Sequence, residues 1–246
     1  MRNIYIGYDA AEPAAYHVLS HSILTRASTP ISITPLVREH LKPFFARERG
    51  PLDSTDFSIS RFLVPYLSGY QGYSIYMDCD MLCLADIKEL WEFINSRHVA
   101  VWCAQHDYVP KSERKMQDQV QTVYPRKNWS SLMIFNNSQC RALTPDYVNT
   151  ASGLDLHRFN WVKSDVLLGK LPILWNYLVG EYDYDPTAKM LHYTLGGPWF
   201  KETRECDRAQ DWLGAYRAMT GQDYWPAQVR EIPRDTTVNL HTGVAK

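Results

Sequence analysis

The stretch "YSIYMDCDMLCLAD" (residues 73–86) places two carboxylates, those of Asp78 and Asp80, inside a run of apolar and aromatic side chains. Burying an unpaired carboxylate costs far more free energy than burying a methylene gains, so the pair needs a partner. The segment 73–77 is typical of a buried strand, and the apolar spacing after Asp86 is typical of a helix. The two aspartates are therefore predicted to lie between a strand and a helix.

Apolar stretches alternate with helical patterns along the rest of the chain. Strands are predicted at residues 3–8, 31–34, 73–77, 99–104 and 131–135. Helices are predicted from Pro13, over 54–67 with a break near Pro65, from a capping box of Asp86 and Glu89, from Thr144 and Pro145, and from Asp207 to Gly221. This alternation favours an α/β fold with a mostly parallel central sheet and helices on both faces.

Length, composition and charge limit the classes of protein to which this chain can belong. The 246 residues, 45% of them hydrophobic, are expected to form one domain, with a core over 1–200 and a helical extension over 201–246. With 26 Lys and Arg against 27 Asp and Glu, and no dense basic block, we expect no nucleic-acid partner.

The chain shows no signal peptide pattern and no apolar run of membrane-spanning length, so we expect no transmembrane segment. The five cysteines form no CxxC pair and are odd in number, which indicates reduced, mostly buried thiols. These features predict a cytoplasmic protein, either free or held peripherally at the inner membrane.

Three aspartates follow predicted strands, at the edge where α/β sheets bind ligands: Asp9, Asp78 and Asp80. An Asp-x-Asp at a strand end points both carboxylates the same way, and a divalent cation such as Mg²⁺ or Mn²⁺ would relieve their repulsion. The alternative is a helix cap or a pair with an arginine. Because Asp86 already supplies the helix cap, the metal site is favoured.

A second polar signal lies in "KMLHYTLGGPWF" (189–200). His192 can ligate a metal through a neutral imidazole, and the backbone amides of Gly196 and Gly197 can approach an anion closely. The alternatives are a core histidine and an ordinary turn.

Four separated motifs resemble the family-eight glycosyltransferases, which include glycogenin and bacterial lipopolysaccharide galactosyltransferases. They are "IYIGYDAAEPAAYHVLSHSIL" (4–24), "SISRFLVPYL" (58–67), "YMDCDMLCLADIKEL" (76–90) and "HYTLGGPW" (192–199), in the family's order. The resemblance covers roughly residues 3–200. It implies a GT-A fold, a nucleotide-sugar donor that is most often a UDP-sugar, Mn²⁺ dependence, and transfer to an acceptor hydroxyl with retention of configuration.

The resemblance also implies roles for single residues. Asp78, Asp80 and His192 match the metal ligands of the family. Asp9 resembles a residue that contacts the nucleoside, with Tyr8 beside the base.

Two further residues match positions near the donor sugar. Arg61 matches an arginine that approaches the sugar and phosphates, the alternative being a surface salt bridge. Asp165 resembles an acidic residue beside the reacting sugar, where the family more often carries an acid and Gln doublet. The segment 128–137 resembles the strand that lines the sugar site, with Ser130 and Ser131 at positions that are usually small.

The chain departs from the family at one position. Gly197 stands where a diphosphate-binding lysine usually precedes the proline. Lys201 can substitute for it, or Arg61 can act with the amides of Gly196 and Gly197. Without such a substitute, the alternative is a non-catalytic nucleotide-sugar-binding protein. A haloacid-dehalogenase-type phosphatase is disfavoured, because its Asp-x-Asp lies in the first strand with a Thr or Val where this chain has Leu82.

Overall fold

The computed structural model describes residues 2–50, 53–107, 114–115, 119–120 and 125–224. The strands are β1 (Arg2–Tyr8), β2 (Ile31–Val37), β3 (Tyr73–Met77), β4 (Met81–Cys83), β5 (Val101–Ala104), β6 (Arg114–Lys115), β7 (Gln119–Val120), β8 (Leu132–Asn136), β9 (Leu168–Leu171), β10 (Tyr177–Leu178) and β11 (Met190–His192). The α-helices are α1 (Pro13–Arg26), α2 (Arg38–Leu41), α3 (Val64–Leu67), α4 (Lys88–Glu92), α5 (Pro145–Thr150), α6 (Gly153–His157) and α7 (Ala209–Thr220). Short 3-10 helices are η1 (Ser60–Leu63), η3 (Trp129–Ser131), η4 (Asn137–Gln139), η5 (Asp165–Leu167) and η6 (Ile173–Asn176).

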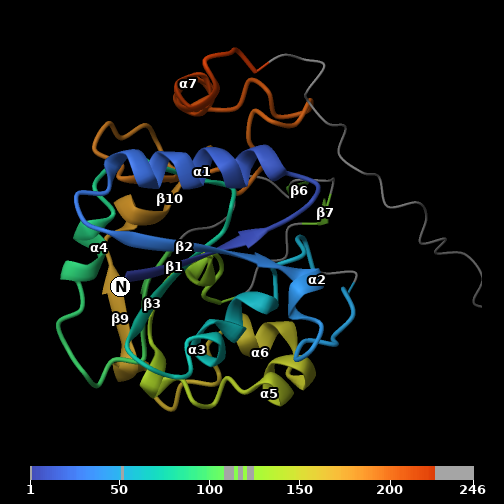
Figure 1. The fold of residues 1–246 in the computed structure, drawn as a ribbon, viewed down its shortest axis with the longest axis vertical. Helices are drawn as coiled ribbons and strands as arrows, with labels where there is room; N and C mark the ends of the chain where they lie inside the picture. Colours follow the sequence, from blue (N-terminus) through green and yellow to red (C-terminus); the bar gives the residue numbers. More distant parts are fainter. Residues whose placement is uncertain (1, 51–52, 108–113, 116–118, 121–124, 225–246) are drawn as a thin grey trace, which may run out of the picture.

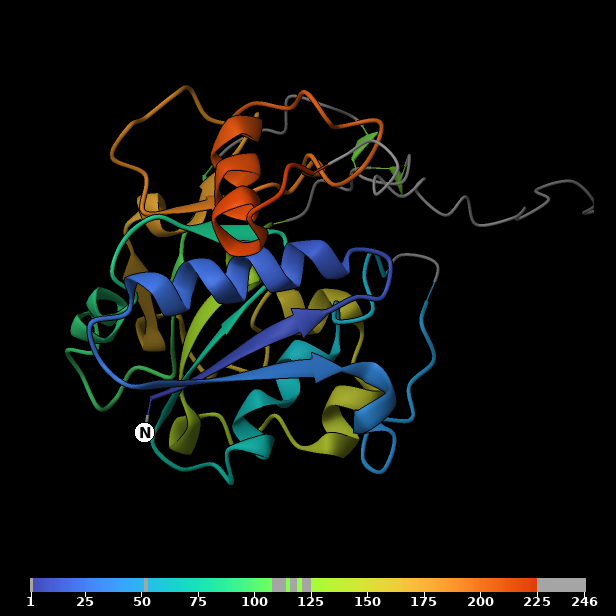
Figure 2. The same ribbon diagram turned by 45° about the horizontal axis from the view of Figure 1, so that its top comes forward.

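The central sheet has six strands in the order β2-β1-β3-β8-β5-β9. All run parallel except β8, which is antiparallel to both neighbours. Helix α1 lies over one face of the sheet, and α3, α5 and α6 lie over the other (Figure 1, Figure 2). The predicted α/β fold with a mostly parallel sheet is therefore confirmed.

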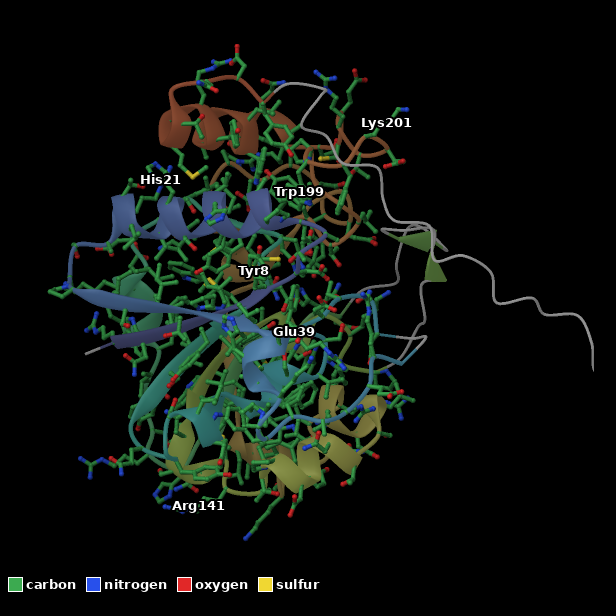
Figure 3. All side chains as sticks on the ribbon, turned by 45° about the vertical axis from the view of Figure 1, so that its right-hand side comes forward. Tyr8, His21, Glu39, Arg141, Trp199 and Lys201 are labelled. Atoms are coloured by element: carbon green, nitrogen blue, oxygen red, sulfur yellow. The ribbon has the colours of Figure 1, made fainter. Side chains whose placement is uncertain are left out.

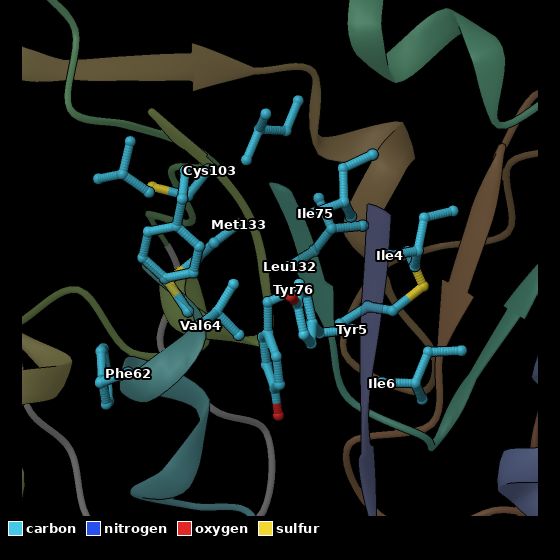
Figure 4. Close-up of a cluster of buried hydrophobic side chains, with 14 of the residues drawn as sticks. Ile4, Tyr5, Ile6, Phe62, Val64, Ile75, Tyr76, Cys103, Leu132 and Met133 are labelled. Atoms are coloured by element: carbon cyan, nitrogen blue, oxygen red, sulfur yellow. The ribbon is translucent and has the colours of Figure 1, made fainter. Parts of the chain in front are cut away.

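The main core fills the space around this sheet. Buried side chains of β1, β3, β5 and β8 meet there, among them Ile4, Ile75, Cys103 and Met133 (Figure 4). The continuous apolar runs of these strands are what a sheet covered on both faces requires. Pro35 lies in β2, where the missing backbone N–H is tolerated because β2 is an edge strand.

A second core joins α1, a smaller sheet and α7. The smaller sheet has the order β10-β11-β4, and Leu82, Leu191 and Trp212 are fully buried in this cluster. Helix α7 crosses α1 on the side away from the main sheet (Figure 1, Figure 2). No strand was predicted between Asp80 and Asp86, yet residues 81–83 form β4, which pairs with β11 in this sheet. Of the predicted extension 201–246, residues 225–246 lie outside the described part.

Several predicted helix boundaries need correction. The segment 54–67 forms the short helices η1 and α3, and Pro65 lies in the first turn of α3, where its missing N–H costs nothing. Asp86 accepts a hydrogen bond from the N–H of Lys88, whereas Glu89 pairs with Lys189 and so makes no capping box.

Helix α7 begins at Ala209, two residues later than predicted. It follows Arg208 in the left-handed region (φ 58°), and it ends as predicted at Gly221 (φ 71°). The N-terminal cap of α5 is confirmed, since the Thr144 side chain accepts from the Tyr147 N–H.

All five cysteines are free, and four are buried, as predicted. Among the described helices, none combines the length and apolar character needed to cross a bilayer.

Candidate functional site

Three potential metal ligands converge where β3, β4 and β11 meet. Asp78 follows β3, Asp80 precedes β4, and His192 ends β11, which pairs with β4. One ligand atom from each lies within 4.8 Å of the others, and all three side chains are buried. The backbone pairing holds this arrangement, because the Tyr193 N–H donates to the Asp80 carbonyl at 2.9 Å. Residues 114 positions apart in the sequence therefore form one group.

The hydrogen bonds of Asn176 fix the orientation of His192. The Asn176 Nδ2 donates to the Asn128 carbonyl (3.1 Å) and to Ser131 Oγ (2.9 Å). Its Oδ1, 2.8 Å from His192 Nδ1, must therefore accept the proton of that nitrogen. His192 Nε2 then faces Asp80 Oδ2 at 3.4 Å, and it is the ring nitrogen left to ligate a metal when the ring is neutral. Sequence analysis missed Asn176, and no motif around it signals this role.

Asp78 is held by an arginine and a tyrosine. Arg61 Nη1 lies 3.0 and 3.1 Å from the two carboxylate oxygens, and Tyr76 Oη donates to one of them at 2.6 Å. Burial raises the pKa of Asp78 to about 6, and the Arg61 charge opposes this increase. Arg61 also donates to the Ser130 carbonyl at 3.0 Å. It is 5% exposed, so the surface salt bridge considered for it does not occur.

Asp80 carries an unsatisfied oxygen. Although burial raises its pKa, the neighbouring His192 and Arg61 hold the pKa of this carboxyl below its ordinary value. Its Oδ1 is buried and has no hydrogen-bond partner among the described residues. An ionised, unpartnered oxygen in an interior is costly unless a cation balances it. Together with His192 Nε2, this oxygen makes the site a fit for a divalent cation.

Asp9, at the end of β1, accepts hydrogen bonds from two loops. Its oxygens accept the N–H groups of Ala11 (2.8 Å) and Asp56 (3.0 Å), and its side chain is buried. Tyr8 is half-buried, with its ring 5.5 Å from that of Tyr16. The contact of Asp9 and Tyr8 with a nucleoside stays a prediction.

A further acidic residue, Glu12, lies beside the group and was missed by sequence analysis. Its carboxylate accepts hydrogen bonds from Trp199 Nε1 (3.0 Å) and Cys79 Sγ (3.5 Å), and it is 3% exposed. Burial, together with the charges of Asp80 and Asp9, raises its pKa well above the ordinary value. The only local signal is its place before Pro13, which indicates a helix start and not a buried carboxylate.

The glycine turn is packed tightly. Gly196 adopts φ 108°, which favours glycine, and its N–H donates to the Tyr193 carbonyl at 2.8 Å. That amide is therefore engaged within the turn. A Cβ built on Gly197 would lie 2.0 Å from the Trp199 ring, so this position has no room for a lysine. Lys201 is exposed on the loop beyond Trp199 (Figure 3).

Asp165 is not brought into the group. Its side chain is 78% exposed and forms an ion pair with Arg126 at 2.7 Å. It precedes β9, whereas Asp9 and Asp78 follow strands that run parallel to β9, so it lies toward the opposite edge of the sheet. Its role beside a reacting sugar stays a prediction.

A buried histidine, His106, follows β5 at the same edge as Asp9 and Asp78. Its Nδ1 lies 2.7 Å from Tyr182 Oη, and its carbonyl accepts from Trp129 Nε1 at 2.9 Å. Burial, with the nearby His192, lowers the pKa of His106 to about 3. This histidine therefore stays neutral in the folded protein.

Solved structures show where this architecture occurs. The chain is similar to the bifunctional glycosyltransferase WbbM (16% identity, TM-score 0.63), covering 93% of this chain and 51% of WbbM. It is similar to the glycosyltransferase GlyE of Streptococcus pneumoniae (14%, TM-score 0.58), covering 87% and 60%. It is also similar to the galactosyltransferase LgtC, solved with donor and acceptor sugar analogs (12%, TM-score 0.56), covering 89% and 96%. The chain thus has the GT-A fold of glycosyltransferases, while spanning only about half the length of WbbM.

No protein-family model matches the chain. Among curated proteins, it is 49% identical over 219 residues to Protein CDI of Arabidopsis thaliana, an alignment that covers 85% of this chain and 84% of that protein. Such identity over most of both chains shows common descent and a shared fold. The chain therefore belongs to the family of Protein CDI.

Proposed function

We propose that this protein is a metal-dependent glycosyltransferase of the family-eight type. It moves a sugar from a nucleotide-sugar, most simply a UDP-sugar, to an acceptor hydroxyl with retention of configuration. The observation that carries this proposal is Asp80. Its buried Oδ1 has no hydrogen-bond partner among the described residues, and its other oxygen faces His192 Nε2 beside Asp78.

The residues present fit the chemistry of transfer. A Mn²⁺ or Mg²⁺ ion held by Asp78, Asp80 and His192 would act as a Lewis acid toward the departing diphosphate. Arg61 fixes Asp78 in place and adds a positive charge beside the leaving group. Asn176 keeps His192 in its ligating tautomer.

The bond changes are those of a substitution at C1 of the sugar. The acceptor oxygen bonds to C1, while the bond from C1 to the diphosphate oxygen breaks. The electron pair of the broken bond stays with the diphosphate, which also takes up the proton of the acceptor hydroxyl. Asp165 and Lys201 keep their proposed roles near the sugar and the diphosphate only if ligand binding brings them closer to Asp78.

The deciding experiment measures Mn²⁺ and UDP binding by isothermal titration calorimetry. Asp80→Asn should abolish Mn²⁺-dependent UDP binding, because the amide removes the charge that the cation needs. Asp207→Asn, an exposed carboxylate on the loop before α7, is the matched control and should bind normally. Unchanged affinity in Asp80→Asn, with normal thermal unfolding, would refute the metal site.

A second candidate function is a non-catalytic nucleotide-sugar-binding protein, favoured by the absence of room for a lysine at Gly197. A panel of UDP-sugars with Mn²⁺ separates the two candidates. Transfer or hydrolysis supports the enzyme, whereas tight Mn²⁺-dependent UDP binding without turnover supports the binding protein.

A further inference from the structure

A cavity of about 600 Å³ lies between the start of α1, the Trp199 turn and α7. Its lining includes Glu12, His17, Tyr216, Met219, Thr220 and Tyr224. Figure 3 shows Trp199 beside the start of α1. The volume falls within the range of sites for small molecules and suits one or two sugar rings.

The lining suits an uncharged, polyhydroxylated ligand. Among the lining residues that the structure describes there is no lysine or arginine, so the cavity offers no fixed cation to a diphosphate or to an anionic lipid. His17 and Thr220 supply hydrogen-bonding groups, whereas the Glu12 carboxylate is already bonded to Trp199 and Cys79. Tyr216 and Tyr224 supply aromatic surface, and their rings meet at 4.7 Å and 81°. Aromatic surface beside acceptor oxygens is the combination that sugar rings contact.

The cavity adjoins the candidate metal group through a single residue. Glu12 lines the cavity, while its carboxylate accepts from Cys79 Sγ between Asp78 and Asp80. The same carboxylate accepts from Trp199 Nε1, which fixes the cavity floor against the turn that follows His192. Glu12 and Trp199 are 3% and 2% exposed, so this floor is built into the fold.

We infer that this cavity binds the acceptor as a neutral saccharide, with Tyr216 and Tyr224 on its rings and Glu12 at its floor. The assignment of the ligand as acceptor rests on the proposed transferase function. The binding of a saccharide does not depend on it. Helix α7 is thereby a specificity element of the site and not only a cover for α1.

The test fills the cavity with a larger side chain. Met219→Trp should weaken the binding of lactose, cellobiose or maltose, followed by saturation-transfer NMR, by about tenfold or more, because the indole takes up the cavity volume. Ala218→Trp is the matched control, an exposed neighbour in α7 that does not line the cavity. Mn²⁺–UDP affinity should be the same in both variants.

Each outcome decides between alternatives. Unchanged disaccharide binding in Met219→Trp would overturn the inference, and so would the absence of any disaccharide binding to the parent protein. Loss of Mn²⁺–UDP affinity in Met219→Trp, with normal unfolding, would overturn it as well, by assigning the cavity to the donor. If the parent binds disaccharides but not Mn²⁺–UDP, the saccharide site is supported and the proposed transferase function fails alone.

Discussion

At the scale of single residues, the properties of the two aspartates depend on their hydrogen-bond partners, which the local sequence does not predict. The Asp-x-Asp pair is visible in the sequence, but only the structure shows that its two members differ. Asp78 is satisfied by Arg61 and Tyr76, whereas Asp80 keeps an unpartnered Oδ1 among the described residues. The asymmetry arises because each carboxylate meets different neighbours from distant segments. We therefore expect Asp80 to be the more sensitive of the two positions for the proposed cation binding.

Gly197 provides a test of packing at the same scale. Gly197→Ala should destabilise the protein by about 1–3 kcal/mol, because the added Cβ would lie 2.0 Å from the Trp199 ring. Urea unfolding followed by tryptophan fluorescence measures this change. In the control Gly214→Ala, nothing lies within 4 Å of the added Cβ, and stability should rise by about 0.5–1 kcal/mol in the helix. Equal stabilities of the two variants would contradict the tight turn.

At the scale of elements, α1 is packed on two sides. Leu19 and Ile23 belong to the main core, whereas Ala15 and Val18 belong to the second core with α7. A helix buried on two sides lacks a clean polar face, and for that reason its sequence gives little sign of which side meets the sheet. The second core depends on α7 covering this helix.

A substitution at Trp212 tests how much the packing of α7 contributes to the free energy of unfolding. It is fully buried between Trp199 and Tyr216, with ring centroids 5.2 and 5.6 Å away. Trp212→Ala should cost about 3–5 kcal/mol of unfolding free energy, since it leaves a large cavity. Leu213→Ala, at a partly buried neighbour, should cost clearly less. A loss below about 1 kcal/mol in urea unfolding of Trp212→Ala would show that α7 contributes little to the fold.

At the scale of the whole molecule, the carboxyl edge of the sheet gathers ionisable groups from across the chain. Asp9, Asp78 and His106 follow β1, β3 and β5, three strands of one sheet. Burial raises the pKa of Asp78 and lowers that of His106, and these shifts link the stability of the fold to pH. For His106, whose pKa is lowered to about 3, the folded protein excludes a proton that the unfolded chain accepts.

The expected effect has a defined sign. As pH falls below the ordinary histidine pKa of 6.5, the unfolded state gains a proton and stability decreases, by roughly 2 kcal/mol from this group at pH 5. His106→Gln should remove this part of the pH dependence between pH 7.5 and 5 in urea unfolding. His40→Gln, at an exposed position in α2, should leave it in place. An unaltered pH slope in His106→Gln would contradict a buried neutral imidazole.

The sequence by itself determined the α/β class and five of the central strands within three residues at each end, and its resemblance to a family implied the grouping of Asp78, Asp80 and His192. These features depend on local periodicity, on turn residues and on motif order, all of which are written along the chain. Tertiary structure decided the antiparallel course of β8, the strand β4 and the burial of Glu12. It also placed Asn176 against His192 and Asp165 away from the site. Those outcomes depend on which strands become neighbours, and that is settled by the packing of residues far apart in sequence, which no local pattern records.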